Sequence, residues 1–179
     1  MEKSVSNLKR WDMVSDVWST VRLGNYCLKI GSGATPTGGK ESYLPYGPVK
    51  LVRSQNVYNH GFSKNGLAFI SNAQASKLDG VSVEEKDILL NITGDSVARV
   101  CLAPKDALPA RVNQHVAIIR PIPEEFDARF LRYFLISPRQ QSLLLGLAAA
   151  GATRNALTKV MIENLEVPKP SLSEKKSYC

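Results

Sequence analysis

The chain has 179 residues, of which 44% are hydrophobic and 22% charged, a composition that is ordinary for one folded domain and excludes a low-complexity or repeat protein. It carries 23 Lys and Arg against 16 Asp and Glu, and this net charge of +7 favours a polyanionic partner, either nucleic acid or an anionic membrane surface. The positive charges are scattered singly, which indicates a folded basic face, and the longest apolar run (143–152) is too short to span a membrane.

The first third of the chain is predicted to consist of short segments joined by loops. Residues 1–20 form a polar lead-in, and residues 21–30 form an apolar segment too short to type as helix or strand. Residues 31–40, GSGATPTGGK, have the composition of a loop, and they lack the Gly-Lys-Ser/Thr of a Walker phosphate-binding loop. The alternation in residues 48–53 then predicts a half-buried strand.

The middle of the chain alternates short apolar runs with connections rich in amide side chains. A connection at 54–61 is followed by a predicted strand at 67–70 and a weak helix at 71–78. Three further runs rich in β-branched residues predict strands, at 88–90, 97–102 and 116–119. Their polar connections, residues 91–96 and 110–115, offer Asn, Gln, Arg, Thr and His, which are suited to hydrogen bonds with base edges.

The last third has helical periodicity. Phe126, Phe130, Leu131, Phe134 and Leu135 form one apolar stripe, which predicts a first helix. Ser-Pro-Arg-Gln at 137–140 is typical of a helix start and predicts a second helix that ends near residue 151. Its inward-facing leucines are predicted to be Leu143, Leu144 and Leu147. A short helix is expected around 158–164, before a segment that leads to a charged tail.

The cysteines indicate a reduced compartment. Cys27, Cys101 and Cys179 are widely spaced, so no zinc pattern or redox Cys-x-x-Cys can be drawn from them. The N-terminal segment lacks the apolar core of a signal peptide. We therefore expect a cytoplasmic protein without a metal or another cofactor.

The order of several short motifs resembles a target recognition domain of the DNA-specificity subunit of type I restriction–modification systems. Each motif is weak alone, but their shared order extends over residues 21–174. In chain order they are Leu23-Gly24, Gly33-Ala34-Thr35-Pro36, Arg53-Ser54-Gln55-Asn56-Val57, Asp87-Ile88-Leu89, Thr93-Gly94-Asp95-Ser96, Val112-Asn113-Gln114-His115-Val116, Phe130-Leu131 before Ser137-Pro138, Gly151-Ala152-Thr153-Arg154, and Val167-Pro168-x-Pro170-x-Leu172-Ser173-Glu174.

The resemblance implies a double-stranded DNA-reading domain that performs no chemistry. In such systems two recognition domains usually share one subunit, and long helices pair as a coiled coil that spaces the half-sites. Methyltransferase subunits dock on this assembly and flip the target adenine, and the restriction subunit joins them. Similar domains also form the recognition part of fused restriction–modification enzymes.

The implied fold is an α+β domain in which a curved, mostly antiparallel or mixed β-sheet is followed by a small helical layer. We divide the chain into a lead-in (1–20), one target recognition domain (21–170) and the truncated start of a spacer-helix region (171–179). With one recognition domain and no spacer helix, the chain is expected to be a fragment, a truncated product or a half-subunit. A second recognition domain or a second copy of the chain is then a further expected partner.

The recognisable motifs and the base-reading residues are predicted to differ, because a fold that reads many targets keeps its scaffold and changes its readers. Asp87 and Asp95 are therefore interpreted as turn residues. Amides suit adenine and Arg suits guanine, which gives these base-reading candidates: Gln55, Asn56, Arg99, Arg111, Asn113 and Gln114. The candidates for phosphate contacts are Lys50, Arg53, Lys64, Arg154 and Lys159.

Two other functions stay open at this point. An enzyme could pair His115 with Asp87 or Asp95 as acid and base, although the sequence lacks a nucleophile elbow, a metal-ligand cluster and a nucleotide fingerprint. It also lacks the Asn/Asp-Pro-Pro-Tyr/Phe tetrapeptide of adenine methyltransferases. The other alternative is an interaction module that docks on a methyltransferase subunit and has little DNA affinity of its own.

Overall fold

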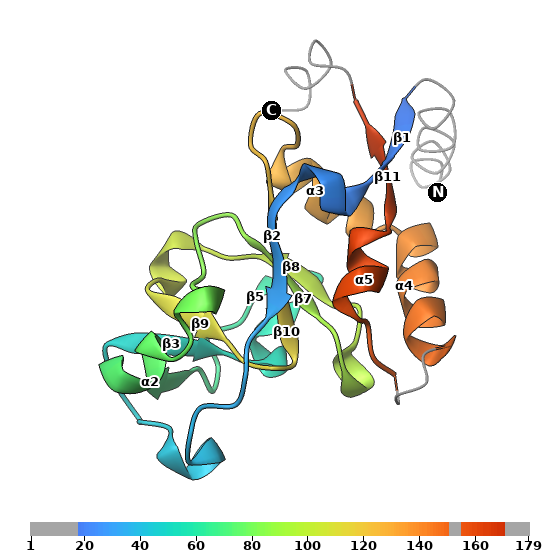
Figure 1. Ribbon diagram of the computed structural model, residues 1–179. Coiled ribbons are helices and arrows are strands. Elements are labelled where there is room, and N and C mark those ends of the chain that lie inside the picture. Colours follow the sequence, from blue (N-terminus) through green and yellow to red (C-terminus); the bar gives the residue numbers. More distant parts are fainter. Residues whose placement is uncertain (1–17, 151–154, 171–179) are drawn as a thin grey trace, which may run out of the picture.

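Four antiparallel strands form the central sheet (Figure 1). The computed structural model describes residues 18–150 and 155–170. The predicted runs 88–90 and 116–119 lie in two neighbouring strands at the middle of the sheet, so these predictions are confirmed. In sheet order the strands are β2 (Cys27–Ser32), β10 (Val116–Pro121), β7 (Ile88–Asn91) and β8 (Val100–Leu102).

The strand β8 is shorter than the predicted run 97–102. Ala98 has a φ of +71°, which interrupts extended backbone, so the strand begins only at Val100. Ala98 and Arg99 belong instead to the connection that leaves β7, together with the 3-10 turn η5 (Gly94–Ser96). The prediction of a strand over 97–99 is therefore wrong.

A second sheet has three strands and one parallel pair. Its order is β6 (Ala68–Ile70), β3 (Val49–Val52) and β9 (Ala110–Val112), and β3 runs parallel to β9. The predicted strands at 48–53 and 67–70 are confirmed by β3 and β6. The segment 110–115 was expected to be a connection throughout, but its first half is β9, in which Ala110 and Val112 are buried and Arg111 alternates with them. Three residues are too few to show this period in the sequence.

The central sheet is buried on both of its faces. Ile88 and Leu90 of β7 pack into the cluster shared with the helices, and Leu89 between them packs with Val116 and Ile118 on the other face. This two-sided burial explains why the strands are continuously apolar although the sheet is antiparallel.

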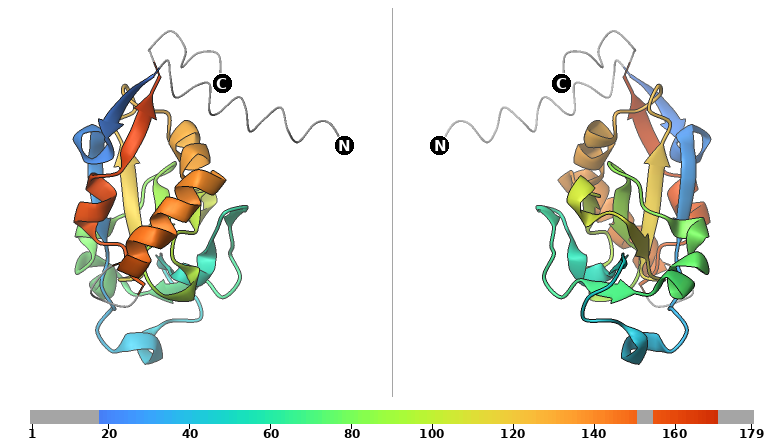
Figure 2. Two further views of the ribbon diagram at one scale, coloured as in Figure 1. Left: turned by 90° about the vertical axis from the view of Figure 1, so that its right-hand side faces the viewer. Right: turned by 90° about the vertical axis from the view of Figure 1, so that its left-hand side faces the viewer.

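Three helices follow the strands in the sequence and gather on one side of the central sheet (Figures 1 and 2). They are α3 (Ala128–Leu135), α4 (Pro138–Ala150) and α5 (Lys159–Glu163), so the three helices predicted for the last third of the chain are confirmed. Side chains cap all three of them: Asp127 accepts from the Arg129 amide at 2.7 Å, Ser137 Oγ accepts from the Gln140 amide at 3.4 Å, and Thr158 Oγ1 accepts from the Met161 amide at 3.2 Å. The mostly antiparallel sheets, followed in the sequence by these helices, confirm the predicted α+β class.

The register of α4 differs from the prediction in one leucine. Gln140, Leu144 and Ala148, spaced by four, form its buried face. Leu147 is half-buried, but Leu143 is 45% exposed, so Leu143 does not point inward as expected. Residues 151–154, which include the predicted stop of the helix and Arg154, lie outside the described residues.

The two ends of the described chain pair with each other. β1 (Ser19–Arg22) runs antiparallel to β11 (Glu166–Lys169), with Val21 opposite Val167. Ser19 and Thr20 were predicted to belong to the lead-in, and no element was predicted at 166–169, so the pairing of β1 with β11 was not predicted. Trp18 is also buried, with its ring edge-on to Phe130 at 5.6 Å between centroids.

Short elements complete the domain. The turns η1 (Leu23–Tyr26), η2 (Gly39–Ser42) and η3 (Ser54–Asn56) follow β1, β2 and β3, and the loop composition predicted at 31–40 is confirmed from residue 33 onward. A hairpin, a helix and two further turns make up the rest: β4 (Val57–Tyr58), β5 (Gly61–Phe62), α2 (Asn72–Ser76), η4 (Asp79–Val81) and η6 (Lys105–Ala107). Within the described residues, no helix is long and apolar enough to cross a membrane.

Candidate nucleic-acid interface

The connections that carry most of the sequence motifs meet at one end of the two sheets. The register places the end of β7 at Asn91 opposite the start of β10 at Val116, and the ends of the parallel strands β3 and β9 side by side. The segment after β2, which contains η2, lies beyond these strand ends at the lower edge of Figures 1 and 2. We call this region the polar end, and it consists of residues 33–38, 53–56, 92–99, 113–115 and 155–157.

Backbone hydrogen bonds hold the connections of the polar end together. The Gly33 amide donates to Asn113 O at 3.1 Å, and the Asn113 amide donates to Val52 O at 3.1 Å. On the helical side, the Leu157 amide donates to Ile92 O at 2.8 Å. The Ile92 amide donates to His115 O at 3.0 Å and connects the two groups, so segments from five parts of the chain are fixed relative to one another, as an interface that reads a rigid ligand requires.

The glycines in the motifs at this end serve the scaffold. A Cβ on Gly33 would lie 1.8 Å from Val112 O, so only glycine allows this close backbone approach. Gly94 has a φ of +72°, which glycine adopts without strain. These two positions confirm the interpretation of the motifs around them as turns.

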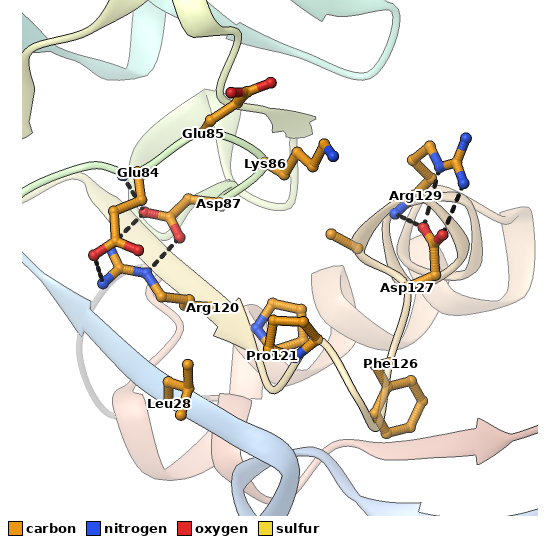
Figure 3. Close-up of a pocket in the computed structure, with 12 residues that line it drawn as sticks. Leu28, Glu84, Glu85, Lys86, Asp87, Arg120, Pro121, Phe126, Asp127 and Arg129 are labelled. Atoms are coloured by element: carbon orange, nitrogen blue, oxygen red, sulfur yellow. Dashed lines mark hydrogen bonds and ion pairs between the residues drawn. The ribbon is translucent and has the colours of Figure 1, made fainter. Parts of the chain in front are cut away.

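Asp87 lies at the opposite end of β7 and is also structural. Its side chain is 1% exposed and accepts two hydrogen bonds from Arg120, at 2.7 and 2.8 Å, and one from the Glu84 amide at 2.8 Å (Figure 3). The hydrogen bond with Asp87, in turn, raises the pKa of Arg120. The carboxylate thus anchors the turn before β7, as predicted, and ties it to β10.

Beside this ion pair is a cavity of about 360 Å³ with Leu28 and Phe126 in its wall (Figure 3). Its acidic groups include Asp87, which Arg120 holds, and Asp127, whose pKa is lowered by the hydrogen bond from Arg129. Carboxylates held in this way are poor proton carriers. These two carboxylates are therefore poorly suited to acid–base chemistry.

His115 does not form the catalytic pair that the enzyme hypothesis requires. Its Nδ1 lies 2.6 Å from Thr93 Oγ1, and its Nε2 lies 3.0 Å from Gln114 Nε2. Asp87 is bound to Arg120 at the far end of β7, and no hydrogen bond joins Asp95 to His115 among the described residues. The described residues also hold no group of three or more His, Cys, Asp or Glu placed to bind a metal ion.

Three of the six base-reading candidates have their polar groups engaged inside the protein. Asn56 is fully buried, accepts from the Arg53 amide at 3.0 Å and donates to two backbone carbonyls. Asn113 is 5% exposed and accepts from the His115 amide at 3.0 Å. Arg111 donates to Asp79 at 2.7 Å and to two carbonyls. These bonds argue against base contacts for Asn56 and Arg111, and the burial of Asn113 argues against one there.

The other three candidates keep polar groups that the protein does not use. Gln55 is exposed and donates to Gly66 O at 3.0 Å, which leaves its side-chain oxygen unbonded. Gln114 donates to His115, and its Oε1 has no partner among the described residues but is buried, so it is not exposed to a ligand in this conformation. Arg99 is half-buried with its guanidinium 4.9 Å from the centroid of the Tyr58 ring. Gln55, Arg99 and Gln114 all lie at the polar end.

The phosphate candidates are spread over several elements. Lys50 donates to Leu108 O at 3.0 Å, and Arg53 donates to Gly66 O and lies over the Tyr43 ring. Lys64 and Lys159 are exposed and form ion pairs with Asp106 at 2.5 Å and with Glu163 at 3.5 Å. Such exposed pairs are weak, so both ammonium groups can exchange their partner for a phosphate. Arg154 lies outside the described residues.

Sequence reasoning missed the hairpin turn beside Arg99. Tyr58 and His60 have stacked rings with centroids 5.0 Å apart, and Asn59 between them accepts from the Val100 amide at 2.8 Å. The segment 54–61 had been singled out for its amides alone. Its aromatic residues carry no local signal, because the contact between Tyr58 and Arg99 depends on how the hairpin packs on β8.

Comparison with known folds gives the same architecture. The chain is similar to the HsdS subunit from Thermoanaerobacter tengcongensis, with a TM-score of 0.68 and 18% identity over 96% of this chain and 40% of that one. It is also similar to the type I restriction–modification S subunit from M. genitalium, with a TM-score of 0.60 and 20% identity over 90% of this chain and 36% of that one. At these identities the likeness shows the shared fold.

A third similar structure comes from work on complex assembly and conformational transition of a type I restriction–modification system, with a TM-score of 0.66 and 21% identity. It is matched over 90% of this chain and 36% of its own length, so the chain spans between 36% and 40% of these three proteins. The model of the type I restriction modification DNA specificity domain matches residues 16–178, nearly the whole chain. The chain therefore belongs to the family of type I restriction–modification DNA specificity domains.

Proposed function

We propose that the chain is a sequence-specific, double-stranded DNA-binding module that directs a restriction–modification complex to its target site. Its partners are the methyltransferase and restriction subunits, and a second recognition domain or a second copy of the chain reads the other half of the target. Family membership and the net charge of +7 both support this assignment. We place the module in the cytoplasm, where it performs no chemistry of its own.

The observation that carries the proposal is the polar end. There, a frame fixed by backbone hydrogen bonds presents Gln55 and Arg99, each with polar groups that no partner among the described residues occupies. Glutamine pairs with adenine and arginine with guanine through two hydrogen bonds each, so these side chains have the chemistry of base readers. The fixed frame would let them meet a groove without a large ordering cost.

A salt titration tests the proposal. The 179-residue chain is titrated with labelled duplexes that contain either a randomised centre or one fixed sequence, and anisotropy is measured at 50 and 200 mM salt. For a DNA-binding module, the logarithm of the association constant falls linearly with the logarithm of the salt concentration, with a slope of about −0.9 for each phosphate contacted. Absence of duplex binding at 50 mM salt would contradict the proposal, and binding of a methyltransferase subunit under the same conditions would then support the interaction module instead.

Single variants separate phosphate contacts from base contacts. Lys159→Ala removes an exposed charge, so it should weaken all duplexes alike and reduce the salt slope by about one. Gln55→Ala should instead weaken the preferred duplex more than the others. Leu143→Ala, on the exposed face of α4, is the control and should change neither quantity.

A further inference from the structure

Arg99 differs from the other described arginine of the polar end. Arg53 is held by Gly66 O, and beyond this end Arg111 and Arg120 are held by Asp79 and Asp87. The Arg99 guanidinium makes no hydrogen bond or ion pair within the described part of the chain. It lies over the Tyr58 ring at 4.9 Å, so one face is covered while the N–H groups stay unbonded.

The ring beneath Arg99 is itself held in place. Tyr58 stacks on His60 at 5.0 Å between centroids, with 28° between the ring planes. Asn59 between them accepts from the Val100 amide at 2.8 Å and donates to Gln141 Oε1 at 3.1 Å. The hairpin turn is thereby bonded to β8 and to α4, and it forms a fixed support for the guanidinium.

We propose that Arg99 reads a guanine through the major groove and that Tyr58 is the positioning residue that orients its guanidinium. The proposal rests on the proposed DNA-binding function and identifies one base, a guanine, within the target sequence. A guanidinium carries its N–H groups in its own plane, as a fork that matches the O6 and N7 acceptors of guanine, and the contact with the Tyr58 ring leaves this fork unbonded. Arg99 is also the last residue of the 92–99 connection, so it stands where the polar end meets the hairpin.

A structural role for the same contact predicts a different result. If Arg99 only covers Tyr58, its loss lowers affinity for every duplex by the same factor. If Arg99 reads a guanine, its loss removes the preference at one base pair and leaves the preferences at the other positions. The distribution of the loss over target positions therefore separates the two roles.

The experiment is a binding selection from a duplex library with a randomised centre, performed at low salt with the full chain. The wild type should prefer guanine at one position by roughly 5- to 150-fold, the equivalent of one bidentate contact. Arg99→Ala should abolish this preference, and Arg99→Lys should reduce it, because an ammonium group lacks the planar fork of a guanidinium. Tyr58→Leu should reduce it, whereas Tyr58→Phe keeps the ring face and should restore it.

Tyr46→Leu is the matched control. Tyr46 is an 84% exposed tyrosine that packs on Phe69, before the start of β3 and away from the polar end. Its replacement should leave every base preference unchanged. Thermal unfolding of each variant shows which of them fold, and if Tyr58→Leu does not fold, the comparison between the Arg99 variants and Tyr58→Phe decides the question.

Two sets of outcomes overturn the proposals separately. Absence of binding by the wild type, or binding without any base preference, removes the proposed function and the role of Arg99 with it. A wild-type guanine preference that persists in Arg99→Ala, or an equal loss on all sequences, removes only the role of Arg99. Loss of the preference in Tyr58→Phe would remove the role of the ring as the support.

Discussion

Replacing Asp87 with alanine should destabilise the domain strongly. Asp87 is 1% exposed, and the Arg120 side chain that it binds is 18% exposed, so the pair is shielded from water. The substitution removes both hydrogen bonds from Arg120 and leaves the Glu84 amide without its acceptor. It therefore separates the turn before β7 from β10, which lies at the centre of the main sheet.

The size of the effect follows from what Arg120 retains. Breaking a buried ion pair from one side costs about 3–5 kcal/mol, because the remaining charge stays buried. Arg120 keeps Ser82 O at 2.9 Å and the carboxylate of Glu84, so we expect the lower limit, about 3 kcal/mol. With a urea m-value of about 2 kcal/mol per molar, the unfolding midpoint should fall by about 1.5 M.

Urea unfolding at pH 7, followed by circular dichroism, measures this midpoint. The control is Glu84→Gln, which removes the partner of Arg120 that is 63% exposed and should lower the midpoint by less than about 0.5 M. Asp87→Asn retains the shape of the side chain and should fall between the two. Equal midpoints for Asp87→Ala and Glu84→Gln would refute the reasoning.

Three further predictions concern other parts of the domain. Gly33→Ala should cost about 2 kcal/mol in urea unfolding because of its clash with Val112 O, whereas Gly31→Ala in the preceding strand β2, with open space around it, should cost much less. The hydrogen bond from Arg129 lowers the pKa of Asp127, so the ionised carboxylate stabilises the folded domain above the unfolded-state pKa, and this stabilisation is lost as pH falls through the folded-state pKa. Asp127→Asn should therefore lower the urea midpoint at pH 7. Equal midpoints for the variant and the wild type at pH 7 would contradict this. Burial raises the pKa of Cys101 to about 12, so iodoacetamide at pH 8 should modify Cys101 far more slowly in the folded protein than in the urea-unfolded protein. Peptide mass spectrometry measures both rates, and equal rates would contradict this.

Elements with a local cause could be predicted from the sequence. The helix start at Ser137 and the apolar runs of β7 and β10 are consequences of neighbouring residues, and the structure contains these expected elements. The ribbon of β1 and β11 and the parallel pair of β3 and β9 were not predicted, because each joins segments far apart in the chain. Short strands of this kind are fixed by their partners, and a single sequence does not reveal the partner.

The sequence predicted the residue types of the candidate site, but it did not predict which of these side chains are exposed and free of protein hydrogen bonds. Asn56 and Gln55 are adjacent amides in one motif, yet Asn56 is buried with three hydrogen bonds and Gln55 is exposed with one. The difference depends on carbonyls of residues 63, 65 and 66, which the fold brings back to this turn. Hydrogen-bond partners at that separation leave no mark on the local pattern.

The positions of the ion pair and the candidate readers suggest how stability and recognition are kept apart in this domain. Asp87 and Arg120 fix the strands at one end of the central sheet, and the buried faces of β7 and β10 leave little room for substitution there. Gln55 and Arg99, at the other end, each make few contacts with the protein, so replacing them should cost little stability. Under the proposed function, a change of base preference at the polar end would therefore not require repacking the sheet, provided that the support under each reader, such as Tyr58 under Arg99, is kept.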